Sequence, residues 1–115
     1  MALISIASCL WFEETPLGAT LNFRATDGPR GIVFKVGISH DSLQGFNKSL
    51  CSSSCLWTIK DGSLTVYGDS EELSLTFCRI SGEYREAAVS LYGEELEAFK
   101  TAINAFACRL QTNLN

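Results

Sequence analysis

The residues best able to do chemistry in this chain are one histidine, five cysteines and several adjacent pairs of glutamates. Nucleophilic catalysis requires a Cys or Ser beside a base, and His40 is the sole imidazole in the sequence. His40 stands next to Asp41, directly before a short segment of helical spacing, where helix capping or surface exposure accounts for it. We therefore expect His40 to have no catalytic role.

The glutamate pairs occur at 13–14, 71–72 and 94–95. Neighbouring residues of a strand point to opposite faces, which argues against the first two pairs acting as paired acids. The third pair opens a predicted helix, where carboxylates stabilise the N-terminal end of the helix dipole. The sequence also lacks a glycine-rich dinucleotide motif, a P-loop and a metal-binding motif. We predict that the protein is not an enzyme and has no cofactor.

The cysteines are Cys9, Cys51, Cys55, Cys78 and Cys108. Their odd number and irregular spacing do not fit a secreted disulfide framework. Cys51 and Cys55 form the one close pair, and a zinc site there would need about two further ligands. We expect ordinary thiols in a reducing compartment and no metal. Residues 1–9 lack the basic leader and long apolar run of a secretion signal, so we expect a cytoplasmic protein.

The composition is typical of a globular domain. The chain has 115 residues, of which 46% are apolar and 19% charged, and its net charge is −4. This length favours a single domain, 1–115. The acidic balance argues against nucleic-acid and membrane-surface partners, and no apolar stretch approaches the ~18 residues of a membrane span. A protein partner or self-association, for example as a homodimer, is the interaction that we expect.

Apolar periodicity predicts the elements that must position any functional residue. Strands are predicted at 2–14, 19–26, 31–39, 56–60, 63–67, 71–80 and 84–91, and helices at 43–50 and 93–110. The terminal helix has an apolar stripe of Leu96, Phe99, Ile103, Phe106 and Leu110. Asp61-Gly62 between two β-rich segments favours a type I′ hairpin turn. We expect an α+β fold, with an antiparallel sheet of about six or seven strands and two helices packed on it.

The two halves of the chain resemble each other. Ser8-Cys9-Leu10-Trp11 recurs as Ser54-Cys55-Leu56-Trp57, and Leu21-Asn22-Phe23 is echoed by Leu75-Thr76-Phe77. The helical segments also align, with Leu43 and Phe46 matching Leu96 and Phe99. One interpretation is a pair of half-repeats, 1–53 and 54–115, each with three or four strands and a helix. The other is that any two strand–helix units share such a pattern.

Segments 32–50 and 87–106 each place Leu-x-x-Phe after a strand, and in this the chain resembles the WapI-type immunity proteins of bacterial polymorphic toxin systems. That resemblance implies a non-enzymatic protein that binds a partner protein, of the immunity or accessory type. The cysteines and tryptophans are not part of that family's pattern. The meander with a terminal helix also looks like a pleckstrin-homology-type domain, which has no helix in mid-chain. The sheet–helix repeats look like Whirly-type single-strand binders, which implies binding of single-stranded nucleic acid.

Two surfaces are candidates for binding. The first is the acidic turn of Asp69, Glu71 and Glu72 with Tyr67 beside it, since exposed acids next to aromatics suit recognition of a basic protein. Trp11 and Trp57 are predicted to lie opposite the apolar face of their strands. Either the sheet is covered on both faces, or the two tryptophans are contact residues. We predict partner contacts at Trp11, Trp57, Tyr67, Asp69, Glu71 and Glu72.

The second candidate is a basic and aromatic sheet face. Arg24, Lys35, Arg79 and Arg85 lie on predicted strands, and Trp57, Tyr67 and Tyr84 could share their face. Such a face binds single strands by base stacking and phosphate contact. A solvated sheet face would carry the same residue types, and the net charge favours that interpretation.

Overall fold

The chain folds as two successive units, each with four strands followed by one helix. The computed structural model describes residues 3–27, 30–59, 62–79 and 85–113. The first unit comprises β1 (Leu3–Ala7), β2 (Leu10–Thr15), β3 (Gly18–Asp27), β4 (Arg30–Ser39) and α1 (His40–Leu50). The second comprises β5 (Ser54–Thr58), β6 (Leu64–Asp69), β7 (Glu72–Arg79), β8 (Arg85–Tyr92) and α2 (Gly93–Asn113). The predicted α+β class and the two helices are confirmed.

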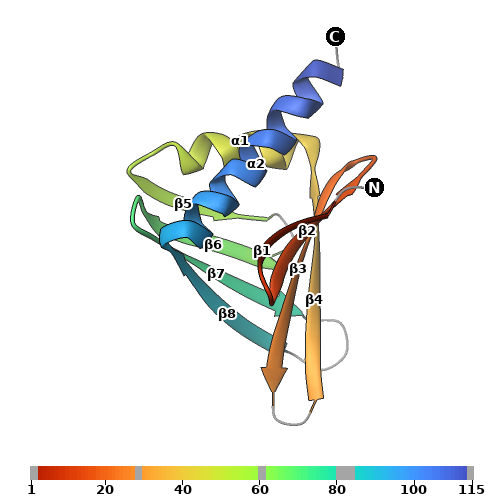
Figure 1. Ribbon diagram of the computed structural model, residues 1–115, viewed down its shortest axis with the longest axis vertical. Coiled ribbons are helices and arrows are strands. Elements are labelled where there is room, and N and C mark those ends of the chain that lie inside the picture. The colour runs from red at the N-terminus through yellow and green to blue at the C-terminus, as the bar shows by residue number, and fades with distance from the viewer. Residues whose placement is uncertain (1–2, 28–29, 60–61, 80–84, 114–115) are drawn as a thin grey trace.

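The strands form two sheets, so the prediction of one sheet with six or seven strands is wrong in this respect. Sheet A has the strand order β1-β2-β3-β4 and sheet B the order β5-β6-β7-β8, all antiparallel. The reason is α1, which leads the chain away from β4 before β5 begins and packs against α2. Both helices lie together on one side of the molecule, between the sheets (Figure 1).

The segment 2–14, predicted as one strand, is a hairpin of β1 and β2. Ala7 pairs with Leu10, which makes Ser8 and Cys9 the turn. This pair contains none of the Gly, Pro, Asn or Asp residues that usually mark turns, and so the sequence pattern missed it. The backbone N–H of Arg24 donates to the Cys9 carbonyl at 2.8 Å. The neighbouring strand β3 thereby stabilises this turn, which Ser8 and Cys9 by themselves favour only weakly.

The predicted Asp61-Gly62 turn lies partly outside the described residues. The register, with Thr58 opposite Thr65, is centred on this dipeptide as expected. However, β5 ends at Thr58 and β6 begins at Leu64. The Ile59 N–H donates to the Leu64 carbonyl at 3.0 Å, and the Gly62 N–H donates to the Ile59 carbonyl at 2.8 Å. The loop between β5 and β6 is therefore longer than predicted.

One hydrophobic cluster lies between the sheets and the helices, and both units contribute to it. Phe23 of sheet A stacks on Phe77 of sheet B with ring centroids 4.9 Å apart. At the helical end, Phe12 of β2 contacts both Phe99 and Phe106 of α2 at 5.5 Å. The sheets therefore meet directly at one end and through the helices at the other.

Both helices bury the faces that their spacing predicts. Ser39 caps α1, since its hydroxyl accepts from the Ser42 N–H at 3.4 Å, and the helix begins at His40, before the predicted start. Leu43, Phe46 and Leu50 are its buried residues. In α2 the predicted stripe is buried at Leu96, Phe99, Ile103 and Phe106, while the side chain of Leu110 lies outside the described part. A complete α1 departs from the pleckstrin-homology plan.

The topology repeats, but only part of the sequence echo follows it. Leu21 and Phe23 on β3 and Leu75 and Phe77 on β7 occupy the third strand of their units, and all are buried. In contrast, Trp11 lies on the second strand of its unit and Trp57 on the first. The shared tetrapeptide therefore does not mark equivalent positions.

Candidate functional site

Sheet B has one face on the core and one face exposed. Along β6, Leu64 and Val66 are fully buried, whereas Tyr67 is exposed. Residues directly opposite in an antiparallel pair share a face, so the register Leu56–Tyr67–Ser74–Ser90 runs across the exposed side. We call this side the outer face of sheet B.

The outer face of sheet B is uncharged over its centre and carries exposed apolar side chains. Leu56 is 74% exposed, Tyr67 50% and Tyr92 66%. The other central positions of the face hold small residues, namely Ser54, Thr58, Thr65, Ser74, Thr76, Ala88 and Ser90. The aromatic rings therefore stand above a flat surface of small side chains.

The β6–β7 turn borders this face with carboxylates. The Asp69 carboxylate accepts from the backbone N–H groups of Glu71 at 2.9 Å and Glu72 at 3.0 Å. These hydrogen bonds, with Glu71 first, lower the pKa of Asp69 because they favour its charged form. Gly68 allows the turn, since a Cβ there would collide with the Glu72 carbonyl oxygen. The turn thus holds the Asp69 carboxylate in place next to the exposed Glu71 and Glu72.

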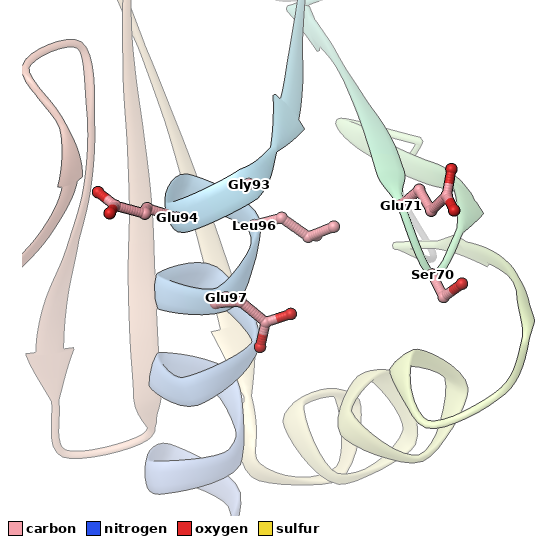
Figure 2. A pocket seen from close by; sticks show the side chains of 6 residues that line it. All are labelled: Ser70, Glu71, Gly93, Glu94, Leu96 and Glu97. Atoms are coloured by element: carbon pink, nitrogen blue, oxygen red, sulfur yellow. The ribbon is translucent and has the colours of Figure 1, made fainter.

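A hollow lies between this turn and the start of α2. Its volume is about 620 Å³, and it is lined by Ser70, Glu71, Gly93, Glu94, Leu96 and Glu97. Figure 2 shows Leu96 and Glu97 reaching from α2 toward the turn, while Glu94 points to the other side of the helix. The hollow combines a small apolar floor with carboxylates, which suits a cationic group better than an anionic one.

Four of the predicted contact residues come together at this end of sheet B. Tyr67, Asp69, Glu71 and Glu72 are all exposed there. Tyr92 joins them because it pairs with Glu72 across the β7–β8 ladder. No motif in the sequence marks Tyr92 or Leu56 as a contact residue. The alternation of β8 would have found Tyr92, since Leu91 is buried and its neighbour must point outward.

Trp57 lies on the inner side of sheet B, opposite to the predicted orientation. It is half-buried, pairs with Val66 and stacks on Phe46 of α1, with ring centroids 4.1 Å apart. Cys55 is buried on the same face, whereas Leu56 points outward. The outer face of sheet B therefore does not include Trp57.

Trp11 lies in register with Asn22 and Lys35 on the side of sheet A opposite the hydrophobic cluster, which we call the outer face of sheet A. Asn22, between the other two, is fully buried. The Arg24 guanidinium sits 5.3 Å from the centre of the indole, a cation–π geometry. A hollow of about 320 Å³ borders the pair and is lined by Leu3, Ser5, Ala7, Ser8, Trp11 and Arg24. Trp11 is thus separated from the acidic turn, because the two belong to different sheets.

The predicted basic and aromatic face is divided between the sheets. Arg24 and Lys35 lie on the outer face of sheet A. Arg79 and Arg85 are directly opposite each other in the backbone register, at the end of the β7–β8 ladder far from the acidic turn. Tyr84 lies outside the described residues.

The histidine and cysteines are dispersed. The His40 backbone N–H donates to the Leu17 carbonyl at 3.1 Å. The Nδ1 atom of the His40 ring is buried and has no hydrogen-bond partner among the described residues. The cysteines are not in disulfides, and Cys55 contacts the Ser49 hydroxyl at 3.5 Å. Across ranges 3–27, 30–59, 62–79 and 85–113, no cluster of three or more His, Cys, Asp or Glu residues could hold a metal ion.

Comparison with known proteins yields no relative: no family model, curated protein or solved structure matches this chain. In the part of the chain that the structure describes, neither helix combines the length and apolar character needed to cross a membrane.

Proposed function

We propose that this protein is a non-enzymatic protein-binding module whose contact surface is the outer face of sheet B. The observation that carries the proposal is the exposure of Leu56 and Tyr67 on the uncharged centre of that face, with Tyr92 exposed beside Glu72 at its acidic end. Protein interfaces have such a composition, because charged residues are depleted at their centre and aromatic residues are enriched. Tyrosine supplies a large contact area at a small cost in conformational entropy, which makes it a frequent hot-spot residue.

The acidic turn supplies the charged rim of this surface. Asp69, Glu71 and Glu72 lie at the end of the β6–β7 hairpin, and Glu97 of α2 lines the same hollow as Glu71 (Figure 2). Complementary charge at an interface rim steers association and excludes partners of the same sign. We therefore assign the partner the opposite chemistry, an apolar patch bordered by lysines or arginines.

The resemblance to WapI-type immunity proteins gives this proposal its most specific form. An immunity-type protein binds and blocks one toxin domain, and the partner would then be a basic toxin domain. An accessory protein with another basic partner would use the same surface. Both forms require the outer face of sheet B and the acidic rim.

The proposal is tested by affinity capture from the source cell with paired surface variants. The wild-type protein is expected to retain one partner stoichiometrically, and the double variant Tyr67→Ser/Tyr92→Ser is expected to lose it. Leu17→Ser is the matched control, because Leu17 is 77% exposed outside sheet B. Capture of no stoichiometric partner, or equal capture by all three proteins, would overturn the proposal.

The rim is tested separately by association kinetics with the captured partner. Glu71→Lys/Glu72→Lys is expected to lower the association rate constant at least about tenfold at low salt. High salt should reduce the difference between this variant and the wild type, because exposed charges are screened. An unchanged association rate would contradict a basic partner.

A second candidate function is binding of single-stranded nucleic acid on the outer face of sheet A. The specific observation in its favour is that Trp11, Arg24 and Lys35 are neighbours on that face. A labelled oligonucleotide should then bind in a salt-dependent manner and lose affinity with Arg24→Glu. Absence of binding at low salt would eliminate this function.

A further inference from the structure

The edges of the two sheets differ in how they are protected. The outermost strands are β1 and β4 in sheet A and β5 and β8 in sheet B. An edge strand offers unpaired N–H and C=O groups to any other strand, and proteins usually block it with lysine, proline, a bulge or a short length. β1 and β5 have five residues each, and the register of β1 is irregular between Ser5 and Ala7. β4 carries Lys35 near its middle.

β8 has none of these protections over its central part. It has eight residues and pairs with β7 in an unbroken register from Arg85 to Tyr92. The run Ala87-Ala88-Val89-Ser90-Leu91 contains no charge and no proline. β8 is therefore a long, regular and uncharged edge.

The side chains of β8 are also incompletely covered. Ala87 and Val89 belong to the face that packs on the hydrophobic cluster, yet both are only half-buried. Ala88 and Ser90 on the outer face are exposed. One more strand beside β8 would cover Ala87 and Val89 and continue the core.

We propose that β8 pairs antiparallel with β8 of a second copy of this chain, about a two-fold axis at Val89. A two-fold axis perpendicular to the sheet keeps the outer faces of both copies on one side, so directly opposite residues must share a face. With Val89 opposite Val89 of the second copy, Ala88 lies opposite Ser90 and Ala87 opposite Leu91. This register pairs the whole uncharged run.

The residues of β8 complement themselves in this register. Each pair in the run joins a small side chain to another small or apolar one. Glu86 lies opposite Tyr92 of the second copy, so no like charges meet directly. Arg85 lies opposite Gly93 of the second copy, next to Glu94 and Glu95 at the start of its α2. This charge complementarity at both ends of the run favours a second copy over an unrelated strand.

The dimer would join two four-stranded sheets into one continuous sheet of eight strands. The two outer faces of sheet B would then form a single, doubled surface. The pairing does not depend on the proposed function, since it needs no other protein. A dimer without a partner would overturn only the proposed function, and a monomer that binds a partner would overturn only this proposal.

The test is sedimentation equilibrium of the purified full chain, with three paired variants. The wild type is expected to be a dimer at micromolar concentrations. Ala88→Lys/Ser90→Lys places lysine opposite lysine twice in the proposed register, and the dimer dissociation constant should rise at least about tenfold. Ala88→Lys/Ser90→Glu places lysine opposite glutamate twice and should restore the dimer. Ser74→Lys/Thr76→Lys puts the same charge on the adjacent strand β7 and should leave the dimer dissociation constant at the wild-type value.

Circular dichroism of each variant shows whether it is folded, and hydrogen exchange locates the contact. Amide protection at 86–92 should increase with protein concentration in the wild type and not in the double-lysine variant. A wild type that stays monomeric up to about 0.1 mM, far above the Kd of a specific dimer, would overturn the proposal. So would a dimer that survives the double-lysine change, or one that only Ser74→Lys/Thr76→Lys disrupts. Protection of β8 that requires a different protein would also overturn it.

Discussion

The indole ring of Trp57 stacks on the phenyl ring of Phe46 with centroids 4.1 Å apart and planes 4° apart. This contact joins α1 to β5, the two elements on either side of the connection between the repeated units. It directs Trp57 to the inner side of sheet B and leaves Leu56 on the outer side. The contact thus determines which face of β5 is available for binding.

Replacing Trp57 should destabilise the fold. Trp57→Ala removes the stacked ring and leaves one side of Phe46 uncovered, so the free energy of unfolding should fall by about 2–4 kcal/mol. Trp57→Phe keeps an aromatic ring and should lose less than half as much. Urea denaturation measures both values. Equal stability of Trp57→Ala and the wild type would show that the stack contributes nothing.

Replacing Gly45 should stabilise the protein. Gly45 lies in the interior of α1, and a Cβ added there would have no neighbour within 4 Å. Gly45→Ala should therefore raise the free energy of unfolding by about 0.5–1 kcal/mol, because alanine loses less backbone entropy in a helix. Thermal unfolding followed by circular dichroism checks the increase. A lower melting temperature would contradict the helix as described.

Gly68→Ala should have the opposite effect. Gly68 has φ +152°, and a Cβ would collide with the carbonyl oxygen of Glu72. The change should cost about 1–3 kcal/mol through backbone strain and should distort the acidic turn. Gly37→Ala is the control, because nothing lies within 4 Å of its added Cβ. If both variants were equally stable, the close approach at Gly68 would not exist.

Asp69 should make part of the stability dependent on pH. Its pKa in the folded protein is below the ordinary value of 3.8, because the N–H groups of Glu71 and Glu72 donate to the carboxylate. A folded pKa below the unfolded one gives a contribution that is complete above pH 3.8 and is lost as the pH falls through the folded pKa.

An NMR titration of the Asp69 carboxyl carbon measures this effect, and its midpoint should lie below 3.8. Asp69→Asn serves as the matched variant, since it keeps an acceptor oxygen and does not titrate. Its stability should fall less steeply than that of the wild type in the acid range. A midpoint at or above the ordinary value would contradict the turn geometry.

The local features of this fold follow from the sequence alone. The helical spacing of Leu96, Phe99 and Ile103 predicts the buried face of α2, and that of Leu43 and Phe46 predicts the buried face of α1. The acidic turn was equally predictable, because Asp69, Glu71 and Glu72 are neighbours along the chain. These features depend on residues a few positions apart, and periodicity and capping report such contacts directly.

The division into two sheets and the composition of the outer face were decided by tertiary structure. Alternation assigns the residues of β5 to two faces but cannot say which is covered, since Leu56 and Trp57 are both apolar. Phe46 decides this from a different element. In the same way, only the β7–β8 register places Tyr92 beside Glu72 on the proposed surface. Contacts between distant segments depend on how the sheets and helices pack, and no local pattern encodes that packing.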